Sequence, residues 1–333
     1  MTIDIKPTSI KTILLAGASG YIGRHVAKAL LDAGLNVVSL YRASSDIDND
    51  LPSSSGQATK LVVDLNDTNV FRDDSNYLPP FDAVISCIAS KTGGINDSWN
   101  TEYLANLNIY HLAIRRSVKR FILLSAICVQ KPKLHFQKAK LAMENELVSG
   151  PIPYTIIRPT AFFKSLAGQV ENVKSGKRFI IFDGGEQTSC KPISERDLAE
   201  FICISLLDQN AENKVLPIGG TGPALTQKAQ GLLLFQLTDK TPRFLVLPSQ
   251  LFKALQILLS PISLFSGRAR NLLEYLRIAH YYATESMLYW DENLSKYSSK
   301  NTPEFGKEDL ESFYKKVLMD GMEEQQLGDH KLF

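Results

Sequence analysis

The sequence predicts an α/β protein built on a doubly wound parallel sheet, and two observations support this fold class. First, short apolar runs alternate with amphipathic stretches over residues 12–160, which is typical of repeated β-α units. Second, three glycines spaced three apart directly follow the first apolar run, at the edge where open α/β sheets bind their ligands. We therefore expect six parallel strands separated by helices.

The first β-α-β unit is predicted over residues 12–41. Gly17 turns the chain after the strand, Gly20 lets the backbone approach a pyrophosphate, and Gly23 lets helix and strand pack closely. The helix N-terminus adds free N–H groups and a partial positive charge. Because a second strand at 36–41 completes the unit, we interpret the turn as a dinucleotide site rather than a plain turn. The predicted cofactor contacts here are Gly17, Ser19, Gly20, Tyr21, Ile22, Gly23 and Arg24.

The residue after the second strand predicts which nicotinamide cofactor binds. Enzymes that prefer NAD usually carry an acidic residue there, which bonds the ribose 2′-hydroxyl. This chain has Arg42 instead, and a planar guanidinium bonds a 2′-phosphate bidentately. Arg24 is a second candidate for that phosphate, and a solvated surface charge is the alternative for both residues. NADPH is therefore the predicted cofactor.

The remaining strands bring further candidate contacts to the same edge of the sheet. They are predicted at 60–65, 81–89, 120–126 and 154–160, with helices around 103–114 and over 133–146. Asp64 ends the third strand and is a candidate contact to the adenine amino group, with a turn or helix cap as the alternative. Ser86 lies in the fourth strand, beside the expected cofactor.

Length and composition limit the functional classes. A chain of 333 residues favours about two domains, and we predict a Rossmann domain for NADPH over 1–160 and a smaller mixed substrate-binding lobe over 161–333, partly interleaved with the sheet. A net charge of +2 gives no electrostatic reason to expect a nucleic acid partner. The four cysteines are scattered, so no metal site is predicted.

The order of motifs resembles the short-chain dehydrogenase/reductase superfamily, in its atypical, NmrA-like branch. That superfamily places a serine at the end of the fifth strand, a Tyr-x-x-x-Lys pair on the next helix, and an Arg-Pro break after the sixth strand. Ser125, Lys140, Arg158 and Pro159 match those places. The resemblance implies that Ser125 and Lys140 are catalytic and that Lys140, Arg158 and Pro159 contact the cofactor.

Phe136 stands where the superfamily has its tyrosine. A phenol is the usual acid that protonates the oxygen formed in ketone reduction, and a phenyl ring has no proton to give. Ordinary carbonyl reduction or alcohol oxidation is therefore disfavoured.

Longer segments resemble a narrower family, the NADPH-dependent divinyl (proto)chlorophyllide 8-vinyl reductases. The segments that carry this resemblance are His135–Leu141 with Glu144, Arg158–Leu166, Gly168–Val170, Cys190–Glu195, Asp197–Ala199, Leu216–Gly220, Gly222–Thr226, Tyr281–Met287 and Tyr289–Asp291. The resemblance implies reduction of the C8 vinyl group of a chlorin or porphyrin to ethyl, in chlorophyll or bacteriochlorophyll synthesis. This chemistry agrees with Phe136, because hydride adds to an alkene conjugated with the macrocycle and no alkoxide forms. Lys140 would then hold the nicotinamide ribose, with an exposed helix lysine as the alternative.

The second half of the chain is predicted to hold this flat tetrapyrrole substrate, which needs aromatic faces and apolar walls. The predicted substrate contacts are Phe136, Phe162, Phe163 and Tyr281. Core packing is the alternative for the phenylalanines after the sixth strand. Further candidates are Arg268, Arg270 and Arg277 for a propionate, His135 and His280 for the substrate magnesium, and Tyr281 and Tyr282 as proton donors.

Local signals in the second half predict structure without chemistry. Residues 177–182 indicate a strand, and Ser194 with Asp197 predicts a capping box at the start of a helix. Thr226 is expected to cap the helix that follows it.

The segment 245–265 is strongly apolar, but Pro248, Lys253 and Pro261 interrupt it, so it is not expected to span a bilayer. A packed lobe or a lid over the tetrapyrrole is the first interpretation, and peripheral contact with a membrane is the second. Residues 1–11 carry no signal or transit pattern. We therefore expect a cytoplasmic protein, with peripheral contact to photosynthetic membranes as an extension of that expectation.

Two other functions remain open at this point. One is another atypical reductase or epimerase-like enzyme with a different substrate, and the other is a non-catalytic sensor that binds NADP(H). The sequence does not predict the oligomeric state.

Overall fold

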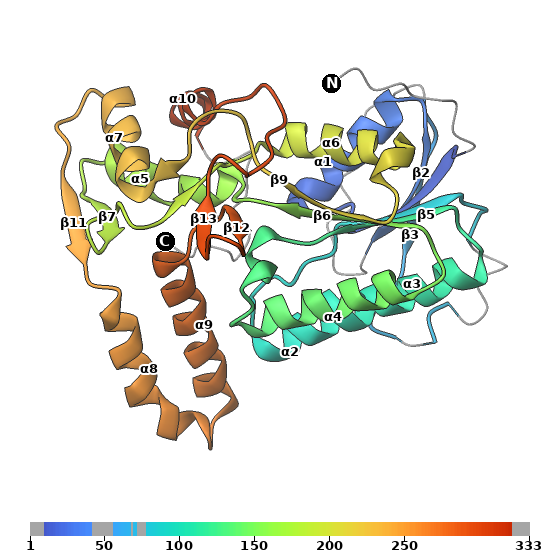
Figure 1. Cartoon of the computed structure of the whole chain (residues 1–333), viewed down its shortest axis with the longest axis horizontal. Coiled ribbons are helices and arrows are strands. Elements are labelled where there is room, and N and C mark those ends of the chain that lie inside the picture. The colour runs from blue at the N-terminus through green and yellow to red at the C-terminus, as the bar shows by residue number, and fades with distance from the viewer. Residues whose placement is uncertain (1–9, 42–55, 68, 72–77, 322–333) are drawn as a thin grey trace.

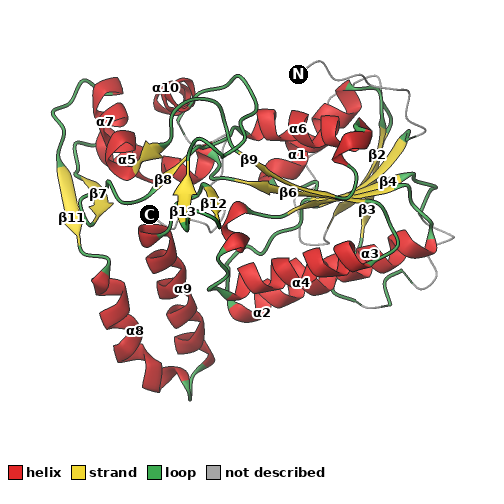
Figure 2. Cartoon of the chain, in the orientation of Figure 1, coloured by secondary structure: helices red, strands yellow, loops and turns green. Residues whose placement is uncertain are grey.

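A twisted parallel sheet lies at the centre of the N-terminal half of the chain (Figures 1 and 2). The computed structural model describes residues 10–41, 56–67, 69–71 and 78–321. Within these residues the sheet has seven strands in the order β3-β2-β1-β4-β5-β6-β9, all parallel. They are β1 (Thr12–Ala16), β2 (Asn36–Tyr41), β3 (Ala58–Val62), β4 (Ala83–Ser86), β5 (Arg120–Leu124), β6 (Tyr154–Pro159) and β9 (Lys214–Ile218). The predicted doubly wound fold is confirmed.

Helices cover both faces of this sheet, which is why its central strands β1, β4 and β5 are almost entirely buried. Alternate residues of β1 point to opposite sides: Ile13 and Leu15 pack under α1 and α6, whereas Leu14 and Ala16 pack on the α3 and α4 side. The covering helices are α1 (Tyr21–Asp32) and α6 (Glu195–Leu207) on one face, and α2 (Ile95–Ser98), the π-helix η1 (Trp99–Ala105), α3 (Asn106–Arg115) and α4 (His135–Ser149) on the other.

The strand order reverses between β1 and β4, which stand next to each other at the centre of the sheet. In open α/β sheets, ligands bind outside the carboxyl ends of the strands at such a switch point. The glycine turn follows β1 directly, so the fold places it there.

The second half of the chain forms a lobe beside the carboxyl edge of the sheet (Figure 1). Its own core contains Phe163, Phe179 and Tyr314. The elements are η3 (Phe163–Gln169), α5 (Val170–Lys174), β7 (Phe179–Phe182), β8 (Ser189–Cys190), β10 (Leu225–Thr226), α7 (Gln227–Leu237), β11 (Phe244–Leu247), α8 (Gln250–Ser263), α9 (Gly267–Thr284), β12 (Tyr289–Asp291), β13 (Lys296–Ser298) and α10 (Leu310–Asp320). Short turns are η2 (Ile127–Gln130) and η4 (Gln209–Ala211).

Two expectations about the sheet need correction. The third strand ends at Val62, and Asp64 lies beyond it in an exposed turn, where its carboxylate accepts the N–H of Asn66 at 3.0 Å. The sheet also has a seventh strand, β9, which the sequence did not indicate because Pro217 interrupts it. A proline is tolerated there because β9 is an edge strand.

The predicted helix caps are partly correct. Ser194 accepts the N–H of Asp197 at 3.0 Å, and Thr226 accepts the N–H of Ala229 at 3.2 Å. The capping box is wrong, because the Asp197 carboxylate turns away from its own helix. It accepts the N–H groups of Lys307 at 3.2 Å and Glu308 at 3.0 Å.

The packed interpretation of 245–265 is wrong for the outer face of α8. Leu258 and Ile262 on that face are exposed, and so are Leu264 and Phe265 in the turn that follows. Hydropathy predicts that a segment will be covered, but it does not say by what.

Glu285, at the end of α9, holds three separate segments together. Its carboxylate accepts one hydrogen bond from Lys131 at 3.0 Å and another from Lys133, and the Tyr297 hydroxyl donates a third at 2.6 Å. Burial opposes ionisation of Glu285, but these hydrogen bonds outweigh it. The pKa of the carboxyl therefore lies below its ordinary value of 4.5.

Glu285→Gln is expected to lower the free energy of unfolding by about 1.5–3 kcal/mol at neutral pH, the worth of charged hydrogen bonds. Because the folded pKa is depressed, the carboxylate stabilises the fold above the unfolded pKa, and this contribution is lost as the pH falls through the folded pKa. The difference between wild type and variant in urea unfolding should therefore be constant from pH 7 to 5 and shrink below 4.5. The exposed pair of Glu311 and Lys315 supplies the control: Glu311→Gln should change stability little at any pH.

Candidate active site

The glycine turn after β1 is packed so tightly that two of its positions require glycine. Gly17 has φ +83°, and a Cβ there would lie 2.8 Å from the carbonyl carbon of Cys87. A Cβ on Gly23 would lie 2.0 Å from the carbonyl oxygen of Gly17. Gly20, the N-cap of α1, donates its N–H to that same oxygen at 2.9 Å.

The N-terminus of α1 carries neither a side-chain cap nor an acidic residue in its first turn. The first N–H groups of a helix have no partner within the helix, so this end attracts an anion. The turn brings these groups beside the ends of β1 and β4, where the backbones of Gly17 and Cys87 meet. The arrangement fits the pyrophosphate of a dinucleotide.

Tyr21, the first residue of α1, connects the glycine turn to the neighbouring helix α6. Its hydroxyl donates to the carboxylate of Glu195 at 2.6 Å, and Lys164 lies 4.4 Å from the centre of its ring. Burial and the negative charge of Glu195 raise the pKa of Tyr21 well above its ordinary value. Arg24 is exposed on α1, and Arg42 lies outside the described residues.

Lys140 is buried and paired, so it is not an exposed helix lysine. Its Nζ donates to Oε2 of Glu102 at 2.7 Å, and only 10% of the lysine side chain and 3% of the glutamate side chain are exposed. The other oxygen of Glu102 accepts the N–H of Ser90 at 2.9 Å. Glu102 belongs to the π-helix η1, and π-helical turns occur frequently at functional sites.

A second buried carboxylate, Glu144, joins three elements at the carboxyl edge. The Ser125 hydroxyl at the end of β5 donates to it. Arg158 on β6 also donates to both of its oxygens, with Nε at 3.1 Å from Oε1. Because the Ser125 proton is already committed to Glu144, the Ser125 oxygen can only accept a hydrogen bond from a ligand.

Ser86 and Pro159 both lie in paired strands of the sheet. The Ser86 side chain is fully buried and donates to Asn106 on α3. Pro159 ends β6, paired with Ile218 of β9. The exposed turn around Asp64 favours the turn-cap alternative for that residue. Within the described residues, no contact of Ser86, Pro159 or Asp64 directs a functional side-chain group toward the glycine turn.

The predicted aromatic contacts separate into two groups. Phe163 is only 2% exposed and packs against Phe313 in the core of the lobe, which favours the packing alternative. Phe162 is half-buried beside the helices over the sheet. Phe136 and Tyr281 share one cluster between the start of α4 and α9.

Tyr281 is held in that cluster by its hydroxyl, which donates to the carbonyl of Cys128 at 3.0 Å. Its ring meets the ring of Tyr282 edge to face, with centroids 5.8 Å apart. Burial raises the pKa of both phenols. Tyr281 therefore keeps its proton at neutral pH and points it at a backbone carbonyl.

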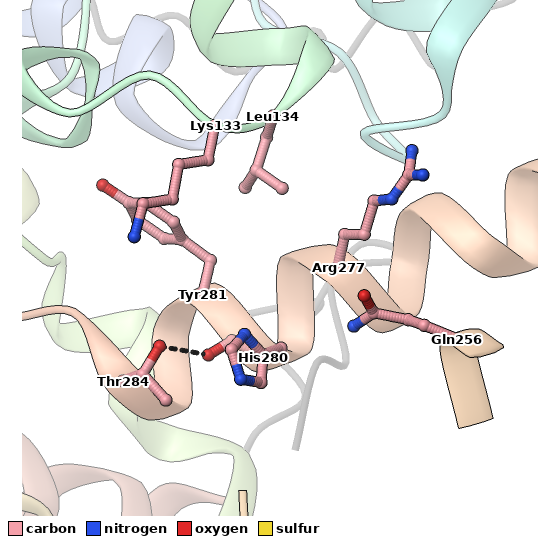
Figure 3. A pocket seen from close by; sticks show the side chains of 7 residues that line it. All are labelled: Lys133, Leu134, Gln256, Arg277, His280, Tyr281 and Thr284. Atoms are coloured by element: carbon pink, nitrogen blue, oxygen red, sulfur yellow. Dashed lines mark hydrogen bonds between the residues drawn. The ribbon is translucent and has the colours of Figure 1, made fainter. Parts of the chain in front are cut away.

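A cavity of about 120 Å³ opens beside this cluster (Figure 3). It is lined by Lys133, Leu134, Gln256, Arg277, His280, Tyr281 and Thr284. Thr284 donates to the His280 carbonyl at 2.8 Å, whereas Nε2 of His280 is buried and meets no partner within the described residues. Burial, with the charges of Lys253 and Lys133, lowers the pKa of His280. The cavity lining thus includes two cations, Lys133 paired with Glu285 and Arg277 paired with Glu274, together with a neutral imidazole.

Comparison with known proteins assigns the family. The family model described as NAD(P)H-binding matches residues 17–209. The divinyl chlorophyllide a 8-vinyl-reductase of Zea mays is 41% identical over 98% of this chain and 84% of that protein. That of Cucumis sativus is 43% identical over 96% of this chain and 79% of that protein. This chain belongs to their family. The resemblance drawn from residues 135–291 is confirmed.

Solved structures share the fold with this chain. The UDP-glucose 4-epimerase of Thermotoga maritima superposes with a TM-score of 0.65 over 94% of this chain and 99% of that one, at 19% identity. At this identity the similarity concerns the fold alone. It supports the assignment of an NAD(P)-type sheet with a smaller C-terminal lobe.

The two buried glutamates are the residues that the sequence did not reveal. Glu144 belongs to a segment that resembles the family, but nothing in its neighbours indicates that it is buried. Glu102 lies just before the helix predicted around 103–114, in a segment that forms a π-helix.

Proposed function

We propose that this protein is an oxidoreductase that reduces the C8 vinyl group of a divinyl chlorophyllide or protochlorophyllide to ethyl, in chlorophyll or bacteriochlorophyll biosynthesis. The observation that carries the proposal is the identity of 41–43% to reductases of that name, over 95–98% of the chain. Phe136 at the position of the superfamily tyrosine supports it, since a carbon–carbon double bond needs no acid to protonate an oxygen.

A nicotinamide dinucleotide, when bound, supplies the hydride for this reduction. The chain's own residues would hold it as follows. The backbone from Gly17 to Gly23 receives the pyrophosphate, and Lys140 receives the nicotinamide ribose. An ammonium has three N–H bonds and Glu102 takes one, so Lys140 still has donors for a ribose hydroxyl. Glu102 thereby fixes the direction in which the ammonium points.

Phe136, Phe162 and the cluster around Tyr281 are proposed to hold the macrocycle, with the cavity of Figure 3 at its margin. A cavity of about 120 Å³ admits a side group rather than a whole tetrapyrrole. Arg277 and Lys133 are suited to a propionate and the neutral His280 to the substrate magnesium. Tyr281 and Tyr282 remain the candidate proton donors to carbon.

We propose NADPH as the physiological cofactor. The proposal rests on Arg42, which follows β2, and on Arg24, exposed on α1 beside the glycine turn. Arg42→Ala is expected to cost about 1.5–3 kcal/mol of NADPH binding, roughly 10- to 150-fold in Kd. Binding of NADH, which has no 2′-phosphate, should change little. Titration of both cofactors against wild type, Arg42→Ala and Arg24→Ala checks this, and an unaltered preference in the first variant contradicts it.

The activity is tested by incubating the protein with divinyl chlorophyllide and NADPH. Loss of the vinyl group removes conjugation, so the expected result is a blue shift of the pigment absorption with matching consumption of NADPH. Intact NADPH binding without any spectral change would favour a sensor that binds the cofactor without using it. Consumption of NADPH with a different substrate would favour another reductase of this fold.

The location is part of the proposal. The names of the plant relatives place those proteins in the chloroplast. The sequence predicts the cytoplasm and contact with photosynthetic membranes for this chain, and both stay predictions that cell fractionation tests.

A further inference from the structure

The helices α8 and α9 form a hairpin that projects from the lobe, away from the sheet (Figure 1). One face of α8 is used inside the hairpin and against the lobe. Gln256 donates to the carbonyl of Leu276 on α9 at 3.2 Å, and the ring of Phe252 lies 5.2 Å from that of Phe182 on β7. The base of the hairpin thus lines the cavity of Figure 3.

Outside the hairpin contact, α8 carries a continuous apolar row. Leu251, Leu255, Leu258 and Ile262 recur at spacings of four, three and four residues, which places them in one row along the helix. All four are exposed. The row continues into the turn between the helices, where Leu264 is 73% and Phe265 92% exposed. An exposed apolar surface of this continuity marks an interaction site.

The charge of the same segment has a single sign. Residues 241–273 contain no aspartate or glutamate. Arg268 and Arg270, which follow the turn, are exposed, and so is Lys253, which lies on the other side of α8 from the apolar row. We call residues 258–270 the hairpin tip.

We propose that the hairpin tip inserts into the headgroup region of an anionic lipid membrane. An apolar face flanked by lysine and arginine is the pattern of elements that lie in the membrane interface. Each basic side chain near an anionic surface adds attraction. No described helix is long and apolar enough to cross the bilayer, so the attachment would be peripheral.

A second copy of the chain fits this surface poorly. A twofold contact through the tip would bring Arg268 and Arg270 of both copies together, and the segment supplies no acidic residue to pair with them. A lid over the substrate also fits poorly, because the exposed row is turned away from the cavity-lining Gln256. The membrane proposal depends on the proposed function in one respect only. An apolar pigment partitions into lipid, and the base of the hairpin lies beside the proposed substrate site.

Vesicle co-sedimentation tests the proposal without any substrate. The full chain is expected to bind vesicles of phosphatidylcholine with about one third phosphatidylglycerol, more tightly than phosphatidylcholine alone, and to bind less as salt is raised. Leu264→Ser/Phe265→Ser should weaken binding to both vesicles at least about tenfold, because it removes apolar insertion. Arg268→Gln/Arg270→Gln should weaken binding about thirtyfold on the anionic vesicles only.

Matched controls lie elsewhere on the surface. Leu294→Ser/Met319→Ser removes two exposed apolar side chains, 58% and 77% exposed, and should leave vesicle binding unchanged. Lys177→Gln/Lys300→Gln removes two exposed charges and should have a small effect. The proposal is overturned if wild type stays in solution with anionic vesicles, or if the controls weaken binding as much as the tip variants. A dimer in sedimentation that Leu264→Ser/Phe265→Ser dissociates would assign the tip to a second copy and overturn it as well. Because no pigment is present, these outcomes are independent of the vinyl reductase activity.

Discussion

Lys140→Met is expected to abolish detectable vinyl reduction and to lower the free energy of unfolding by about 3–5 kcal/mol. The variant leaves the carboxylate of Glu102 buried without its cation, and an uncompensated buried charge is among the most destabilising changes a fold can suffer. Urea unfolding measures the stability, and the change in pigment absorption measures the activity.

The double variant Lys140→Met/Glu102→Gln separates the two roles of the lysine. Removing both charges should restore most of the stability, because no unpaired charge then remains buried. Activity should stay lost, since the proposed donor to the nicotinamide ribose is absent. If the double variant were to recover activity along with stability, Lys140 would be a structural residue only.

Gly23→Ala is expected to lower the free energy of unfolding by about 3 kcal/mol, the upper end of what overpacking costs. The added methyl group would lie 2.0 Å from the carbonyl oxygen of Gly17, a backbone atom that cannot rotate away. The start of α1 must therefore shift. Because that shift moves the N–H groups proposed to bind the pyrophosphate, cofactor affinity should fall at least about tenfold.

Gly267→Ala is the matched control for this substitution. Gly267 also lies in the first turn of a helix, but a Cβ there meets nothing within 4 Å. Its stability and cofactor binding should equal those of wild type in thermal unfolding and NADPH titration. Wild-type cofactor binding by Gly23→Ala would contradict the proposed position of the pyrophosphate.

The sequence was informative where a local pattern decides the structure. The strand at 36–41 has the predicted bounds, because its residues are buried on both faces and a glycine ends the helix before it. The glycine turn could also be located, because its pattern is local. Its spacing reflects contacts between residues six positions apart, such as Gly17 and Gly23.

The sequence was uninformative where a residue's role depends on distant partners. Glu144 reads as an ordinary surface glutamate of a helix until β5 and β6 place Ser125 and Arg158 beside it. Glu102 becomes buried because of the local change to a π-helix. The apolar residues near 258–265 were expected to be covered by the chain itself, and the fold instead leaves them on its surface.

The two hydrogen bonds that Lys307 and Glu308 donate to the Asp197 carboxylate join distant parts of the chain. These bonds connect residues 307–308 to α6, which packs on the sheet. Beside them the tilted rings of Phe201 and Phe305 lie with centroids 5.2 Å apart. The chain thus leaves the N-terminal half to form the C-terminal lobe and then returns to it. The two halves are therefore expected to melt cooperatively, as one calorimetric transition. A fragment cut at residue 160 would lack α6 and β9, and we expect it to be unfolded.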